Sequence, residues 1–159
     1  MKKHQPNAFW RYKQIHENVM DQFRRTGFIR SDDLAFGDVK DGRVRLAGRI
    51  ECAGWIYLTV TKDLRVVSGS GETALVETEW YSYNVALEGE GNILRHDSPH
   101  RHRLEHHVHR FDVLNGDRLG KASVITDGAH PTLGQVIQEA QEWFYNNVDE
   151  VARRRVGDL

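Results

Sequence analysis

The chain lacks several features that would assign it to a class at once. Its 159 residues include one cysteine, Cys52, so that an intramolecular disulfide and any metal site built on paired cysteines are excluded. No apolar run approaches the roughly 20 residues that cross a bilayer. The formal charge is only −1 with histidines neutral, which excludes a generally basic nucleic-acid coat and confines any polyanion site to a local patch. These absences predict a soluble cytoplasmic protein that does not engage a membrane.

Motifs of the large enzyme classes are also missing. The sequence has no phosphate-binding glycine loop, no nucleophile elbow and no dinucleotide fingerprint. It has no internal repeat, no low-complexity run and no composition typical of a linker. We therefore expect one domain over residues 1–159, large enough for an ordinary hydrophobic core.

Two segments carry the apolar period of a helix. In residues 9–23, apolar side chains recur every three or four positions, with Asn7 as a candidate N-cap and Gly27 as a candidate end. Near the C-terminus, Thr132 and Gln135 have the spacing of a capping box, and a long amphipathic pattern follows them. The sequence thus predicts an N-terminal helix and a longer C-terminal one.

Between these helices the apolar period changes to two, which is typical of strands. Residues 28–40 have no clear period and are expected to be irregular, and Lys62-Asp63 is interpreted as a turn. The fold class predicted is α+β, an antiparallel sheet of about five to seven strands packed by the two helices. The predicted strands are residues 43–51, 55–61, 64–68, 73–87, 93–97, 106–114 and 119–126.

A glycine-containing hairpin turn centred on Glu90 joins two of these strands. If it closes there, Val85 lies opposite about His96, and Asn84 lies opposite Asp97. This register is the one on which the arrangement of the following histidines depends.

Histidines are concentrated in one segment. Six of the nine lie between His96 and His109, where the acids are Asp97 and Glu105. Because the unperturbed pKa of imidazole is about 6.5, such a segment can exchange protons near neutral pH or bind a metal. The local charge is positive even with every histidine neutral, so we expect it to attract an anion. The arginines among or beside these histidines are Arg95, Arg101, Arg103 and Arg110.

The order of motifs in residues 76–113 resembles a known pattern. It consists of Tyr81-Ser82-Tyr83 ahead of a glycine turn, then Arg95, Asp97, Ser98, Pro99 and His100, and a closing His106-His107-Val108-His109. This is similar to the central signature of the TumE-type toxin family, small prokaryotic proteins that are typically paired with an antitoxin carrying a helix-turn-helix DNA-binding domain. The resemblance implies an intracellular growth-inhibiting effector with an antitoxin partner and RNA as a possible substrate.

Metal-independent RNA cleavage needs a base, an acid and cations that face the charge developing on phosphorus, and no cofactor. In this hypothesis His107 and His109 exchange the protons, and Asp97 orients a histidine. Arginines supply the charge, and aromatic side chains stack on bases or donate hydrogen bonds. The candidate catalytic residues are His107, His109, Arg95, Asp97 and Tyr83, and the candidate substrate contacts are Arg101, Arg103, Arg110, His100, His102 and Trp80.

Two further hypotheses remain open. In the first, His107 and His109 bind zinc or another divalent transition metal together with His100 or His102, and Asp97 is a fourth ligand or supports one. Such an ion is either structural or assists phosphodiester hydrolysis. In the second, the segment is a non-catalytic patch that binds RNA or an antitoxin, or is simply a solvated surface.

Overall fold

A computed structural model describes residues 5–99, 105–125 and 130–157. In these residues two helices accompany one antiparallel sheet, so the predicted α+β class is confirmed. The elements are β1 (Asn7–Ala8), α1 (Phe9–Arg25), β2 (Ile29–Asp32), β3 (Ala35–Phe36), β4 (Arg43–Cys52), β5 (Ile56–Ser68), β6 (Leu75–Leu87), β7 (Gly91–Asp97), β8 (His107–Arg110), β9 (Lys121–Val124) and α2 (Leu133–Gly157).

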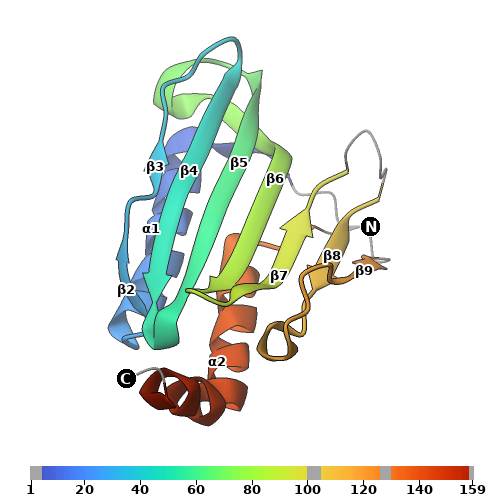
Figure 1. The fold of residues 1–159 in the computed structure, drawn as a ribbon. Coiled ribbons are helices and arrows are strands. Elements are labelled where there is room, and N and C mark those ends of the chain that lie inside the picture. Colours follow the sequence, from blue (N-terminus) through green and yellow to red (C-terminus); the bar gives the residue numbers. More distant parts are fainter. Residues whose placement is uncertain (1–4, 100–104, 126–129, 158–159) are drawn as a thin grey trace.

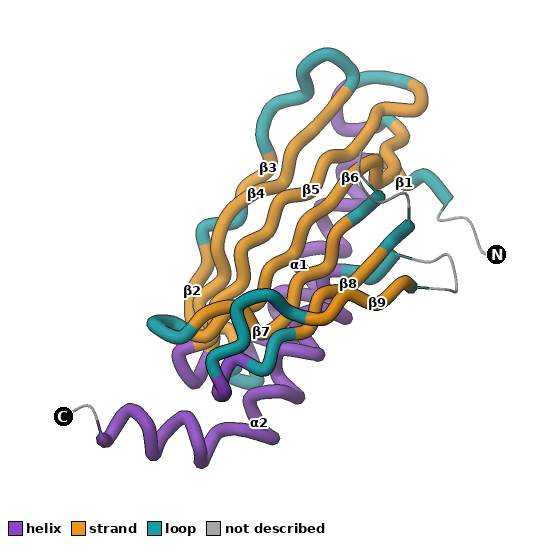
Figure 2. Tube along the Cα trace, turned by 45° about the vertical axis from the view of Figure 1, so that its right-hand side comes forward, coloured by secondary structure: helices purple, strands orange, loops and turns teal. Residues whose placement is uncertain are grey.

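Both helices cover the same face of the sheet. Its strands follow the order β2-β4-β5-β6-β7-β8-β9, with β1 beside β6 and β3 beside β4. Both helices lie behind the sheet in Figure 1, and the turned view in Figure 2 also places them on one side. We call the side that packs against α1 and α2 the covered face and the other side the open face.

The core lies between the covered face and the helices. Side chains of a strand alternate between faces, so every second residue of β5, β6 and β7 points toward α1 and α2. Each fully buried Val, Leu, Ile, Phe or Met side chain stabilises the fold by roughly 1.5–3 kcal/mol relative to the same side chain in water. Core members from the strands and both helices include Leu58, Val60, Tyr81, Tyr83, Val85, Leu94, Met20, Val136, Ile137 and Ala140.

The helix boundaries follow local signals in most places. The backbone N–H of Gln135 donates to Thr132 Oγ1 at 3.1 Å, and that of Thr132 donates to Gln135 Oε1 at 2.9 Å, so the capping box is confirmed. Gly27 ends α1 with φ 80°, as predicted. The predicted cap by Asn7 is wrong, because Asn7 belongs to β1 and pairs with Val76. Neither helix of the described chain is long and apolar enough to span a membrane.

Three strand predictions need correction. Residues 28–40 are not irregular throughout, since β2 and β3 form there and pair with β4. The turn predicted at Lys62-Asp63 is wrong, because β5 continues through both residues. Asp63 instead accepts hydrogen bonds from Arg45 on β4, which lies directly opposite it. The strands predicted at 106–114 and 119–126 are shorter than expected and form β8 and β9.

The predicted register of the β6–β7 hairpin is wrong by two positions. Val85 pairs with Leu94 rather than His96, because Leu87 pairs with Gly91 and the turn therefore centres on Gly89 rather than on Glu90. The one-residue shift of the ladder between Val85 and Ala86 offsets part of this difference. A shift of two residues leaves every side chain on the same face, since strands alternate with a period of two. His96 therefore still points to the covered face and Asp97 to the open face.

Candidate functional site

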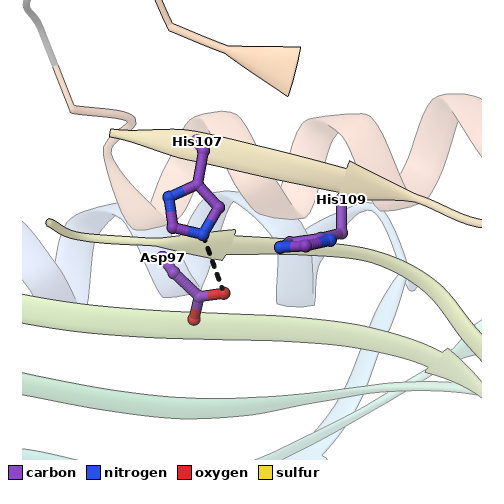
Figure 3. Close-up of side chains that lie close together, drawn as sticks. All are labelled: Asp97, His107 and His109. Atoms are coloured by element: carbon purple, nitrogen blue, oxygen red, sulfur yellow. Dashed lines mark ion pairs between the residues drawn. The ribbon is translucent and has the colours of Figure 1, made fainter. Parts of the chain in front are cut away.

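An acid and two imidazoles meet on the open face where β7 and β8 pair. Asp97, the last residue of β7, lies directly opposite His107, the first residue of β8. Two positions along, His109 lies opposite Arg95. Because paired antiparallel residues and their second neighbours share a face, all four side chains are on one side. Figure 3 shows three of them together. We call Asp97, His107 and His109 the open-face cluster.

The three side chains of the cluster are within reach of one small ligand. One donor atom from each lies within 4.8 Å of the others. His107 Nε2 is 3.8 Å from Asp97 Oδ2, the pair joined by the dashed line in Figure 3. The His107 and His109 ring centroids are 5.1 Å apart, with an interplanar angle of 75°.

Asp97 is held by two neighbours on the same face. Ser82 Oγ on β6 donates to Oδ1 at 2.8 Å, and Arg95 Nε donates to Oδ2 at 2.7 Å. These bonds fix the carboxylate plane. They leave lone pairs on both oxygens, since each carboxylate oxygen can accept more than one bond.

The backbone fixes the tautomer of His107. Its Nδ1 lies 3.0 Å from the carbonyl oxygen of Glu105. A carbonyl oxygen only accepts, so Nδ1 carries a proton and donates it. In the neutral ring Nε2 then has the lone pair, and this atom faces Asp97. His107 is 1% exposed, whereas His109 is partly exposed and its ring stacks on Phe111. His109 is therefore the ring that an external ligand reaches first.

The charges of the cluster and its neighbour nearly cancel. Asp97 and Arg95 contribute one negative and one positive charge at a separation of 2.7 Å. With neutral imidazoles the arrangement can accept a cation through three donor atoms. With a protonated imidazole it can receive an anion and transfer a proton to it.

Two residues predicted for the site lie on the covered face instead. Tyr83 is 0% exposed and stacks on Tyr81 with centroids 5.1 Å apart, and burial raises its pKa well above the usual value. Arg110 donates to Glu139 of α2 at 2.9 Å. The sheet separates both side chains from the open-face cluster, which corrects the roles predicted for them there.

Two other histidines of the segment also face the helices. His96 Nε2 lies 2.9 Å from Glu139 Oε1, and His106 Nδ1 lies 2.7 Å from the Tyr81 hydroxyl. Burial would raise the pKa of Glu139, but its bonds to His96 and Arg110 more than offset this and hold the pKa below its usual value. Burial, followed by the nearby His107, lowers the pKa of His106. These contacts join the sheet to α2 and the core.

The remaining predicted residues are divided between the open face and the undescribed part of the chain. Trp80 is partly exposed and shares its face with Ser82, two residues further along β6. Ser82 was missed by the sequence analysis, although its position on the face of Trp80 is a usable signal once the register is known. The predicted contacts that lie outside the described residues are His100, Arg101, His102 and Arg103.

No family model, curated protein or solved structure matches the chain. The resemblance of residues 76–113 to TumE-type toxins therefore stays a prediction.

Proposed function

We propose that the chain is a toxin-like effector that cleaves phosphodiester bonds in RNA with a divalent transition-metal ion bound by Asp97, His107 and His109. The observation that supports this proposal is the convergence of one carboxylate and two imidazoles within 4.8 Å on the open face. The toxin role and the RNA substrate rest on the sequence resemblance, and the chemistry rests on this cluster.

The cluster has the supporting contacts that metal ligands require. Metal-bound imidazoles usually donate their second ring N–H to a carbonyl or carboxylate oxygen. His107 has such a bond, from Nδ1 to the backbone carbonyl oxygen of Glu105. Donors around a tetrahedral zinc ion at about 2.1 Å are roughly 3.4 Å apart, so the cluster must contract by about 1.4 Å at its widest. Small rotations of the three side chains would provide this closure.

Three protein ligands would leave one position of a tetrahedral ion for a water molecule or a phosphate oxygen. In hydrolysis the water oxygen bonds to phosphorus, the ester P–O bond breaks, and the leaving oxygen takes up a proton. Arg95 is beside this position and can face the negative charge on phosphate.

Metal-independent cleavage by the same histidines is the second candidate. The observation that favours it is the Arg95 guanidinium, whose charge beside Asp97 opposes a dication and suits a phosphate. In this chemistry a histidine takes the 2′-hydroxyl proton, that oxygen bonds to phosphorus, and the P–O5′ bond breaks as the 5′ oxygen receives a proton. His109 contacts the substrate, because His107 is almost fully buried.

Metal content and RNA cleavage separate the two candidates. Protein treated with EDTA and dialysed is loaded with zinc, manganese or nickel, dialysed again, and assayed for bound metal and for cleavage of RNA. His109→Asn removes one ligand, and His106→Asn is the matched control because His106 is on the same segment but faces the core. Circular dichroism verifies that both variants are folded.

The metal proposal predicts one ion per chain and metal-dependent cleavage, both lost in His109→Asn and kept in His106→Asn. Cleavage in EDTA that His109→Asn abolishes would support the second candidate. Folded protein that neither retains an ion nor cleaves RNA would reject both.

The toxin role has its own test in a bacterial host. We expect expression of the unchanged chain to arrest growth and degrade RNA, and expression of His109→Asn at an equal level to do neither. Equal arrest by the two proteins would reject the open-face cluster as the source of toxicity.

A further inference from the structure

A cavity of about 260 Å³ lies on the covered face, away from the open-face cluster. Its walls include Tyr12, Ile15 and Val19 of α1, Val76 of β6 and Leu133 of α2, and the polar side chains of Gln5, Asn7, Thr78 and Thr132 also contribute to them. Most of this lining is apolar. At about 30 Å³ per water-sized group, the cavity holds roughly nine non-hydrogen atoms. This is the size of a small metabolite rather than of a nucleotide or a peptide.

Lys62 of β5 lies in the wall of this cavity. It is 7% exposed, at a position directly opposite Tyr81 of β6 and Leu46 of β4, where an apolar side chain is expected. Its ammonium makes no hydrogen bond or ion pair within the described residues, and its nearest aromatic contact is the Tyr12 ring, 5.1 Å from Nζ to the centroid. Burial lowers the pKa of Lys62 to about 8, so the side chain is still largely protonated at pH 7.

The other titratable groups around the cavity do not neutralise this charge. Glu77 also contributes to the wall but is ion-paired with Arg65. Burial raises the pKa of the Tyr12 hydroxyl above the usual value, so this group is neutral at pH 7.

Two histidines complete the titratable groups at the cavity wall, and neither supplies a negative charge. Burial lowers the pKa of His16, with a further contribution from the charge of Lys62. His130 lies in the segment before α2. The cavity therefore combines an apolar interior with a single buried ammonium that has no counter-ion among the residues described around it.

We propose that this cavity binds a small monocarboxylate of roughly nine non-hydrogen atoms in all, with its carboxylate on the Lys62 ammonium and its apolar body against α1. An isolated buried charge is costly, and a carboxylate offsets that cost by a charge-assisted hydrogen bond. A neutral ligand of the same shape fills the space but leaves the ammonium unpaired. This site does not depend on the chemistry proposed for the open-face cluster, because the sheet lies between them.

Heptanoate and heptan-1-ol are matched probes of the site, since they differ only in the charged head. We expect isothermal titration calorimetry at pH 7 to show heptanoate binding at least about tenfold more tightly than the alcohol. Lys62→Met has nearly the same shape without the charge and should abolish this preference. Lys13→Met removes a lysine of α1 that is paired with Glu72 outside the cavity and should retain it.

The preference should also disappear at pH 10, where Lys62 is largely deprotonated and the carboxylate is still charged. Equal affinities for the two probes at pH 7, or no binding of either, would overturn the proposal. So would a preference for heptanoate that survives in folded Lys62→Met protein.

Discussion

Replacing Lys62 by Met measures how strongly the covered face disfavours a buried charge. Burial lowers the pKa of Lys62 from 10.5 to about 8, a difference of about 2.5 pKa units. At 1.36 kcal/mol per unit, the charged form is disfavoured in the folded state by about 3 kcal/mol relative to the unfolded chain. Methionine fills nearly the same space without a charge. We therefore expect Lys62→Met to raise the free energy of unfolding at pH 7 by about 3 kcal/mol.

The pH dependence of this difference has a definite sign. Between pH 8 and 10.5 the unfolded chain binds more protons at Lys62 than the folded chain, so the unfavourable contribution of the lysine decreases as pH rises. Urea unfolding of both proteins at pH 7, 9 and 10.5 should show the advantage of methionine shrinking toward zero. Lys13→Met is the control for loss of a more exposed lysine. A Lys62→Met protein that is no more stable at pH 7, or an advantage that stays constant with pH, would refute the reasoning.

Three other substitutions test separate parts of the structure. Arg95→Gln keeps a hydrogen-bond donor near Asp97 but removes a positive charge that repels a bound dication. For a guanidinium about 6 Å from the ion in a water-like dielectric, a chelator competition should show zinc bound on the order of tenfold more tightly. Unchanged or weaker binding would contradict a metal between Asp97, His107 and His109. Tyr83→Phe removes a buried hydroxyl that has no hydrogen-bond partner in the described chain, and urea unfolding should show a gain of about 1 kcal/mol rather than a loss. Thr132→Ala should lower the free energy of unfolding by about 1 kcal/mol, whereas Thr132→Ser should not.

The sequence predicts best where the signal is local. The capping box of Thr132 and Gln135 and the end of α1 at Gly27 depend on residues a few positions apart, and both are found as predicted. The course of β5 depends on distant partners. Lys62-Asp63 has the composition of a turn, but Asp63 pairs with Arg45 of β4 and Lys62 extends into a cavity formed by two helices. The residue pattern within one strand carries no information about which residues of other strands and helices will pack against it.

Alternation along β8 divides the predicted site residues between the two faces of the sheet. His107 and His109 lie on one face, and Arg110 lies on the other, where it donates to Glu139. The assignment of Arg110 to the site came from composition alone and fails for that reason. To predict the contact of Ser82 with Asp97, the register of the β6–β7 hairpin must be known, and the turn residues alone do not determine it.

The most direct test of the proposed metal centre is an anomalous diffraction measurement. Crystals of EDTA-treated protein soaked in zinc are measured at the zinc absorption edge, and the anomalous difference map is calculated. We expect one strong peak about 2.0 to 2.2 Å from a ring nitrogen of His107, a ring nitrogen of His109 and a carboxylate oxygen of Asp97. Zinc peaks elsewhere on the molecule, with none between these three side chains, would contradict the proposed centre.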